Sequence, residues 1–142
     1  MTTLASPFIP HRLLPKPWWL RLVTKPWAWV TLAPVIYHPG DINPAAPQWA
    51  PQVAHERVHL LQQTQIGLLV FLRSYVFNRA FRFEVEIEAM SAELVRLAPS
   101  ARPRAQEAYA RDLAGRPYFW AAPSMEAALN DLALAVAGRE RP

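Results

Sequence analysis

The segment His55-Glu56-Arg57-Val58-His59 constrains the chain more than any other stretch of its sequence. On an α-helix successive residues turn by about 100°, so two histidines four residues apart lie on one face and can bind a single ion. Glu56 lies on the flank of that face, within reach of a water molecule on the ion. His-Glu-x-x-His on a helix is a zinc-binding arrangement. The alternative interpretation is a coincidence of two helical histidines with a solvated glutamate between them.

The chemistry of zinc explains these residue types. Neutral imidazole is a common zinc ligand, and three protein ligands leave the fourth tetrahedral position for water. The ion lowers the pKa of that water to about 7, and a nearby carboxylate can take its proton and later give it to a leaving amine. Glu56 is the candidate for this base, and Gln62 continues the stripe of the two histidines. The motif therefore predicts a metal-binding helix over residues 48–65 and a third ligand further along the chain.

Composition sets limits on the class of protein. The chain has 142 residues, of which 52% are apolar, so we expect residues 1–142 to form a single domain with its own core. The longest wholly apolar run covers residues 66–72, far fewer than the roughly 20 that span a bilayer, so no integral membrane span is expected. The first residues lack a signal-peptide pattern and cysteine is absent, which makes a cytoplasmic location the default expectation.

The chain carries a net charge of +4, which favours acidic partners or nucleic acid. Its arginines are scattered, however, rather than gathered into one basic segment. We interpret them as solvated faces of helices and do not expect nucleic acid as the partner.

Local patterns divide the chain into segments. Residues 1–26 form a proline-rich arm, expected to be irregular up to residue 17. Residues 27–38 are rich in aromatic and β-branched side chains, which predicts an edge strand or hairpin with Pro34 at an edge or a turn. In zinc peptidases such a strand commonly aligns an extended substrate, and the alternative is a strand that only covers the helix. Further helices are expected over residues 68–77, over 79–97, and as a pair within 103–138.

Two other features could belong to a site. His38 follows the expected strand, where a lone histidine is more often a surface residue than a ligand. Arg116-Pro117-Tyr118-Phe119-Trp120 is an aromatic loop that either lines a cleft or plugs the core, and we favour the plug.

His55-Glu56-x-x-His59, followed by Glu86 after a further 26 residues, resembles the gluzincin clan of zinc metallopeptidases. In that clan two histidines and a glutamate from a second helix hold the metal. With the Gln62-Gln63 pair after the second histidine, the motif is similar to the His-Glu-x-x-His-x-x-Gln motif of small bacterial and phage zincin-like proteins. The resemblance implies that His55, His59 and Glu86 bind Zn²⁺ and that Glu56 is the general base.

The resemblance also directs attention to supporting residues. The clan often has an aspartate that supports a ligating histidine four residues after the glutamate, and Met90 occupies that position here. Gln62 is a candidate for such a supporting role. The residue that stabilises the transition state is a tyrosine or histidine in these enzymes, and the candidates are Tyr75, Tyr109, Tyr118 and His38.

The direction of each carboxylate on the 79–97 helix separates Glu86 from its neighbours. At 100° per residue, Glu86 lies about 60° from the centre of the apolar stripe, Glu84 about 100° and Glu88 about 140°. A carboxylate at the border of the buried face must be paired or bound to a cation. The alternative is that Glu86 pairs with an arginine such as Arg57 or Arg82.

The expected fold is α+β and mostly helical, a minimal zincin-like domain with one edge strand or hairpin beside the metal-binding helix. The predicted function is a zinc-dependent metallopeptidase that hydrolyses peptide bonds of a peptide or protein substrate. A second interpretation is a non-catalytic zincin-like structural or interaction protein, for example a phage particle component, which would place it in a virion. A third is a basic nucleic-acid-associated protein.

Overall fold

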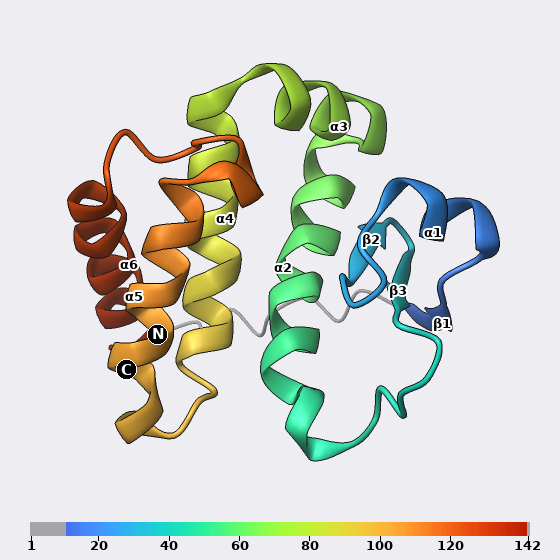
Figure 1. The fold of residues 1–142 in the computed structure, drawn as a ribbon, viewed down its shortest axis with the longest axis horizontal. Coiled ribbons are helices and arrows are strands. Elements are labelled where there is room, and N and C mark those ends of the chain that lie inside the picture. The colour runs from blue at the N-terminus through green and yellow to red at the C-terminus, as the bar shows by residue number, and fades with distance from the viewer. Residues whose placement is uncertain (1–10, 142) are drawn as a thin grey trace, which may run out of the picture.

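The computed structural model describes residues 11–141, so the start of the expected proline-rich arm lies outside the described residues. The protein is α+β and mostly helical, which confirms the fold class expected from the sequence. Figure 1 shows the small sheet and α1 on one side of helix α2, with α4, α5 and α6 on the other side. The elements are β1 (Arg12–Pro15), α1 (Trp18–Val23), β2 (Val30–Leu32), β3 (Val35–His38), α2 (Ala50–Ile66), α3 (Leu68–Phe77), α4 (Arg79–Leu94), α5 (Arg102–Leu113) and α6 (Met125–Glu140), with short 3-10 helices at Pro47–Trp49, Pro99–Ala101 and Arg116–Tyr118.

The sheet has three strands in the order β1-β3-β2. β2 and β3 form the expected hairpin and pair antiparallel, with Pro34 in the turn between them. β1 pairs parallel with β3, so the expectation of irregular chain up to residue 17 is wrong for Arg12–Pro15. Pro15 is compatible with a strand because β1 lies at the sheet edge, where a missing backbone donor is tolerated.

Two short connections place α2 and α4 side by side. Gly67 ends α2 with a φ of 93°, a conformation that residues with a side chain rarely adopt. At the start of α4 the side chain of Asn78 accepts a hydrogen bond from the backbone nitrogen of Phe81. Helix α3 crosses one end of the pair in Figure 1, and α2 packs directly against α4. The histidine-bearing face of α2 can therefore meet side chains from α4.

The main hydrophobic core holds α4 from its other side. Leu94 and Leu113 are fully buried in it, and burying one leucine side chain contributes about 1.5–3 kcal/mol. Met90, at the position where the resemblance suggested a supporting aspartate, also belongs to this core. The core thus fixes the rotation of α4 about its axis. Its buried members are Met90, Leu94, Ala110, Leu113, Ala121, Ala122, Ala128 and Leu132.

The helices are short compared with the thickness of a bilayer. α2 has 17 residues, whereas a transmembrane helix needs about 20 consecutive apolar ones. Among residues 11–141 no helix has the length and apolar character needed to cross a membrane.

Candidate metal centre

Three buried side chains meet between α2 and α4: His55 and His59 from α2, and Glu86 from α4. The Nε2 atoms of the two histidines are 3.1 Å apart. Nε2 of His59 lies 3.5 Å from Oε1 of Glu86, and Nε2 of His55 lies 3.6 Å from Oε2. A tetrahedral ion with bonds of about 2.0–2.2 Å separates its ligand atoms by about 3.3–3.6 Å. The three side chains therefore have nearly the spacing of a ligand set, and this group could hold a metal ion.

Glu86 has one oxygen that is paired and one that is not. Its Oε1 accepts a hydrogen bond of 2.6 Å from the hydroxyl of Tyr75. Its Oε2 is buried and has no hydrogen-bond partner among the described residues. Arg82, considered above as a partner for Glu86, instead donates to backbone carbonyls such as that of Tyr118. A buried oxygen without a partner costs about 1–3 kcal/mol or more, and a cation would supply the missing partner.

The carboxylate of Glu86 and the imidazole of His59 carry opposite charges and lie close together between α2 and α4. Burial raises the pKa of Glu86, but the charges of His59 and His55 and the hydrogen bonds from His59 and Tyr75 lower it below its usual value of 4.5. Burial lowers the pKa of His59, while the charges of Glu86 and Glu56 and hydrogen bonds to Glu86 and Gln62 raise it to about 9. Near neutral pH Glu86 is thus ionised, and His59 carries a proton that must leave before a metal ion binds.

Glu93 orients the first histidine. Nδ1 of His55 lies 3.0 Å from Oε2 of Glu93, and Oε1 of Glu93 accepts a 2.6 Å hydrogen bond from the hydroxyl of Tyr109. A carboxylate can only accept, so His55 donates from Nδ1 and presents Nε2 to the centre. Sequence analysis missed Glu93, although it lies seven residues after Glu86 and so within about 20° of it around the helix.

Gln62 orients the second histidine. Its Oε1 lies 2.9 Å from Nδ1 of His59, while its Nε2 donates to Oε2 of Glu88 at 2.7 Å and to the backbone carbonyl of Val85 at 3.2 Å. The two acceptors on α4 fix the direction of the amide, so its oxygen must face His59 and His59 must donate from Nδ1. Both histidines are therefore held with Nε2 toward the centre, as metal-binding histidines usually are.

Glu56 is 5% exposed and lies beside this group. Its Oε2 accepts a hydrogen bond of 2.8 Å from the hydroxyl of Thr31 on β2, and its Oε1 accepts one of 3.1 Å from Gln52. Thr31 was not predicted to contribute to the site, because a partner 25 residues away is set by how the hairpin packs on α2. The two hydrogen bonds fix the carboxylate without a cation at its side.

The side chain of Gln63 joins β2 to α2. Its Oε1 accepts a 2.8 Å hydrogen bond from the backbone nitrogen of Ala33, and its Nε2 donates 2.9 Å to the backbone carbonyl of Thr31. The amide thus pairs with the outer edge of β2 much as a neighbouring strand would. These two hydrogen bonds fix the position of β2 along the axis of α2, next to the two histidines.

The group opens into a cleft of about 880 Å³. One wall is formed by β2 and the residues before it, including Trp27, which is 70% exposed. The other wall includes Tyr109 and the Pro117–Phe119 segment. This volume lies within the range of small-molecule and cofactor sites, about 300–1,000 Å³. The three candidate ligands therefore line a cleft between two partly apolar walls.

Pro117, Tyr118 and Phe119 of the aromatic loop line this cleft, so the preferred interpretation as a core plug is wrong for the loop as a whole, although Tyr118 also packs against the hydrophobic core. Phe119 is 70% exposed and Trp120 is 55% exposed. Both have positive φ angles, 51° and 50°, which are strained for residues with large side chains. Arg82 holds the loop by donating to the carbonyl of Tyr118 at 3.0 Å, and its guanidinium lies 5.8 Å from the ring of Phe119.

The remaining candidates occupy different places. Tyr75 and Tyr109 contact Glu86 and Glu93 as described, and Tyr118 lines the cleft. His38 is buried at the end of β3, with its Nδ1 2.6 Å from the carbonyl of Pro39, and it is not among the residues that line the cleft. The structure therefore brings the three tyrosines to the site and leaves His38 outside it.

No protein-family model, curated protein or solved structure matches this chain.

Proposed function

We propose that the protein is a zinc-dependent metallopeptidase with a gluzincin-like ligand set of His55, His59 and Glu86. The observation that carries the proposal is the spacing of 3.1–3.6 Å among their donor atoms, next to the separately held carboxylate of Glu56. Two imidazoles and one carboxylate form the ligand set of catalytic zinc sites that keep one position open. When bound, zinc would lower the pKa of a water molecule and polarise the carbonyl of the scissile bond.

Glu56 takes the proton of the attacking water and returns it to the leaving amine. Its hydrogen bonds from Thr31 and Gln52 keep the carboxylate in place through both steps.

Tyr118 donates a hydrogen bond to the carbonyl oxygen as negative charge develops on it. Its hydroxyl makes no hydrogen bond with other described residues, whereas the hydroxyls of Tyr75 and Tyr109 are already used by carboxylates. Burial raises the pKa of Tyr118 well above 10, and the charges of Glu86 and Glu56 raise it further. The phenol thus remains a protonated donor at every physiological pH.

The substrate lies extended along β2, by addition of a strand to the sheet edge. Gln63 occupies the outer edge at Thr31 and Ala33, so the peptide pairs with the preceding part, residues 28–30. This section lines the cleft and leads the peptide past Glu56.

Two substitutions test the proposal. Glu56→Gln keeps all three ligands, so we expect it to bind zinc like the parent and to lose hydrolysis of a peptide library, read by mass spectrometry. His59→Ala removes a ligand and should lose both zinc and hydrolysis. Cleavage by the zinc-loaded Glu56 variant at the parental rate would overturn the proposed mechanism.

A non-catalytic zincin-like interaction protein is the second candidate. The observation that favours it is the exposed apolar surface of α1, where Trp18 is 73%, Leu22 76% and Val23 74% exposed. Apolar surface of this kind often marks a protein interface. This candidate requires that the parent protein binds zinc and cleaves no member of the peptide library.

A further inference from the structure

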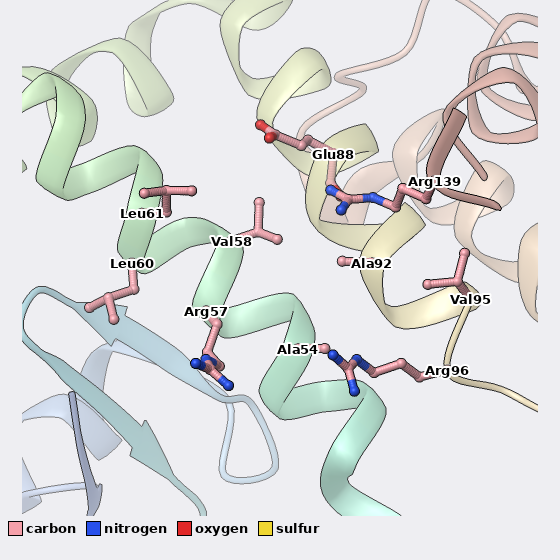
Figure 2. A pocket seen from close by; sticks show the side chains of 10 residues that line it. All are labelled: Ala54, Arg57, Val58, Leu60, Leu61, Glu88, Ala92, Val95, Arg96 and Arg139. Atoms are coloured by element: carbon pink, nitrogen blue, oxygen red, sulfur yellow. The ribbon is translucent and has the colours of Figure 1, made fainter. Parts of the chain in front are cut away.

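A second cleft, of about 500 Å³, lies between α2 and α4 and shares no lining residue with the cleft at the metal group. Figure 2 shows side chains from both helices around it, with Arg139 reaching in from α6. None of the proposed metal ligands or Glu56 contributes to it. The lining residues are Ala54, Arg57, Val58, Leu60, Leu61, Glu88, Ala92, Val95, Arg96 and Arg139.

Three guanidinium groups surround this cleft. Arg139 is held in position, because its Nε donates 2.6 Å to the hydroxyl of Ser91 and its Nη2 donates 3.0 Å to the backbone carbonyl of Glu88. The guanidinium groups of Arg57 and Arg96 make no hydrogen bond or ion pair with any other residue of the 11–141 range. In Figure 2 the side chain of Arg96 reaches toward Ala54, whereas that of Arg57 lies on the side of α2 that faces the hairpin. Two cationic groups that line the cleft thus lack a counter-charge among the described residues.

The acidic residue of the cleft does not neutralise these groups. Glu88 has its Oε2 engaged by Nε2 of Gln62 at 2.7 Å and forms no ion pair with the arginines among the described residues. Three guanidinium groups and one carboxylate leave a net charge of +2 around the cleft. The site therefore has the charge to bind a dianion, and arginine forks bind phosphate or carboxylate oxygens in pairs.

The floor of the cleft is apolar. It is formed by small and aliphatic side chains from both helices, including Ala54, Val58, Leu61, Ala92 and Val95. A cleft of this volume lined by apolar groups with a few charged ones is typical of a site for a small molecule. Inorganic phosphate alone would leave the floor exposed to water, whereas an anion on an apolar body would cover it.

We propose that this second cleft binds a small organic anion, in which a phosphate or carboxylate group is attached to an aromatic or aliphatic body. Arg57 and Arg96 bind the anionic group, Arg139 adds to the positive field, and the apolar body lies on the floor between α2 and α4. The proposal does not rest on the reaction proposed at His55, His59 and Glu86, because the two clefts share no lining residue.

Calorimetric titration of the full chain with phenyl phosphate, benzoate, inorganic phosphate and benzyl alcohol tests this site. We expect phenyl phosphate to bind at least tenfold more tightly than inorganic phosphate, and benzyl alcohol not to bind. The comparison of phenyl phosphate with benzoate identifies which oxyanion is preferred. Amide shifts in a parallel NMR titration should centre on Ala54 and Ala92.

The matched variants are the double substitutions Arg57→Gln/Arg96→Gln and Arg73→Gln/Arg104→Gln. Both remove two exposed arginines, but only the first pair lines the cleft. The first variant should weaken phenyl phosphate binding at least tenfold and the control less than twofold, with equal melting temperatures. Equal losses in both variants, or equal binding of phenyl phosphate and inorganic phosphate, would overturn the proposal. Binding of an oligonucleotide through Arg57 and Arg96 without binding of either aromatic anion would assign the cleft to nucleic acid instead.

Discussion

Replacing Glu93 with glutamine should weaken zinc binding about tenfold. In the parent, Nδ1 of His55 donates 3.0 Å to a carboxylate oxygen of Glu93, whose side chain is 12% exposed. A hydrogen bond to a charged group contributes about 1.5–3 kcal/mol and a neutral one about half as much. Glutamine keeps an acceptor and loses the charge, so the expected loss is about 1–1.5 kcal/mol, close to a factor of ten in affinity.

Two further variants bracket this value. Glu93→Ala removes the acceptor as well, and we expect a loss of up to about a hundredfold, within the range for residues that support metal-binding histidines. Tyr109→Phe removes only the hydroxyl that donates to the other oxygen of Glu93, so a loss of a few fold is expected. The order of the three variants follows directly from how much of the contact to His55 each one removes.

The assay is competition for zinc with a chromophoric chelator at fixed pH and salt. Glu84→Gln is the matched control, because Glu84 is exposed on the same helix and its substitution removes the same charge. The reasoning would be refuted if Glu93→Gln and Glu84→Gln bound zinc with affinities within twofold of each other.

Three other predictions concern the centre itself. Glu86→Gln should weaken zinc binding at least tenfold relative to Glu84→Gln in the same competition assay, and an equal effect of both would remove Glu86 from the ligand set. The pKa of His59 is raised to about 9, so zinc displaces its proton at neutral pH and the apparent affinity should rise about tenfold per pH unit between pH 6 and 8. Calorimetry in buffers of different ionisation enthalpy measures that proton, and a pH-independent affinity would contradict the raised pKa. Tyr118→Phe should lower kcat about a hundredfold at unchanged zinc affinity, and a parental kcat would exclude Tyr118 as the donor to the carbonyl oxygen.

Local sequence patterns were sufficient to predict the elements that carry the candidate centre. The histidine motif predicted the helix now seen as α2, and apolar positions spaced four and three apart predicted α4. The direction of Glu86 relative to that apolar stripe predicted that it would border the buried face, and the structure brings its carboxylate to the two histidines. These features depend on the period of one helix and not on long-range packing.

The parts that sequence analysis missed depend on contacts between distant segments. Thr31 reaches Glu56 because Gln63 fixes the position of β2 along the axis of α2. Glu93 faces His55 only at the particular rotation of α4 that its core imposes. The contact of Thr31 has no signature in the local sequence, whereas the spacing of seven residues from Glu86 does place Glu93 on the same face of α4.

Two segments were misjudged for the same reason. The parallel pairing of β1 with β3 joins residues more than 20 positions apart, and prolines beside the strand concealed it. The aromatic loop looked like buried chain because of its composition, but Arg82 holds its carbonyls so that Phe119 faces the cleft. Composition alone does not determine on which side of such a loop its rings lie.

Anomalous diffraction from crystals of the zinc-loaded protein, measured on both sides of the zinc absorption edge, tests the proposed centre most directly. We expect one strong peak per chain, about 2.0–2.2 Å from Nε2 of His55, from Nε2 of His59 and from a carboxylate oxygen of Glu86. Glu56 should face the fourth position without bonding to the ion. A peak bonded to other side chains, or no peak between α2 and α4, would contradict the proposed metal centre.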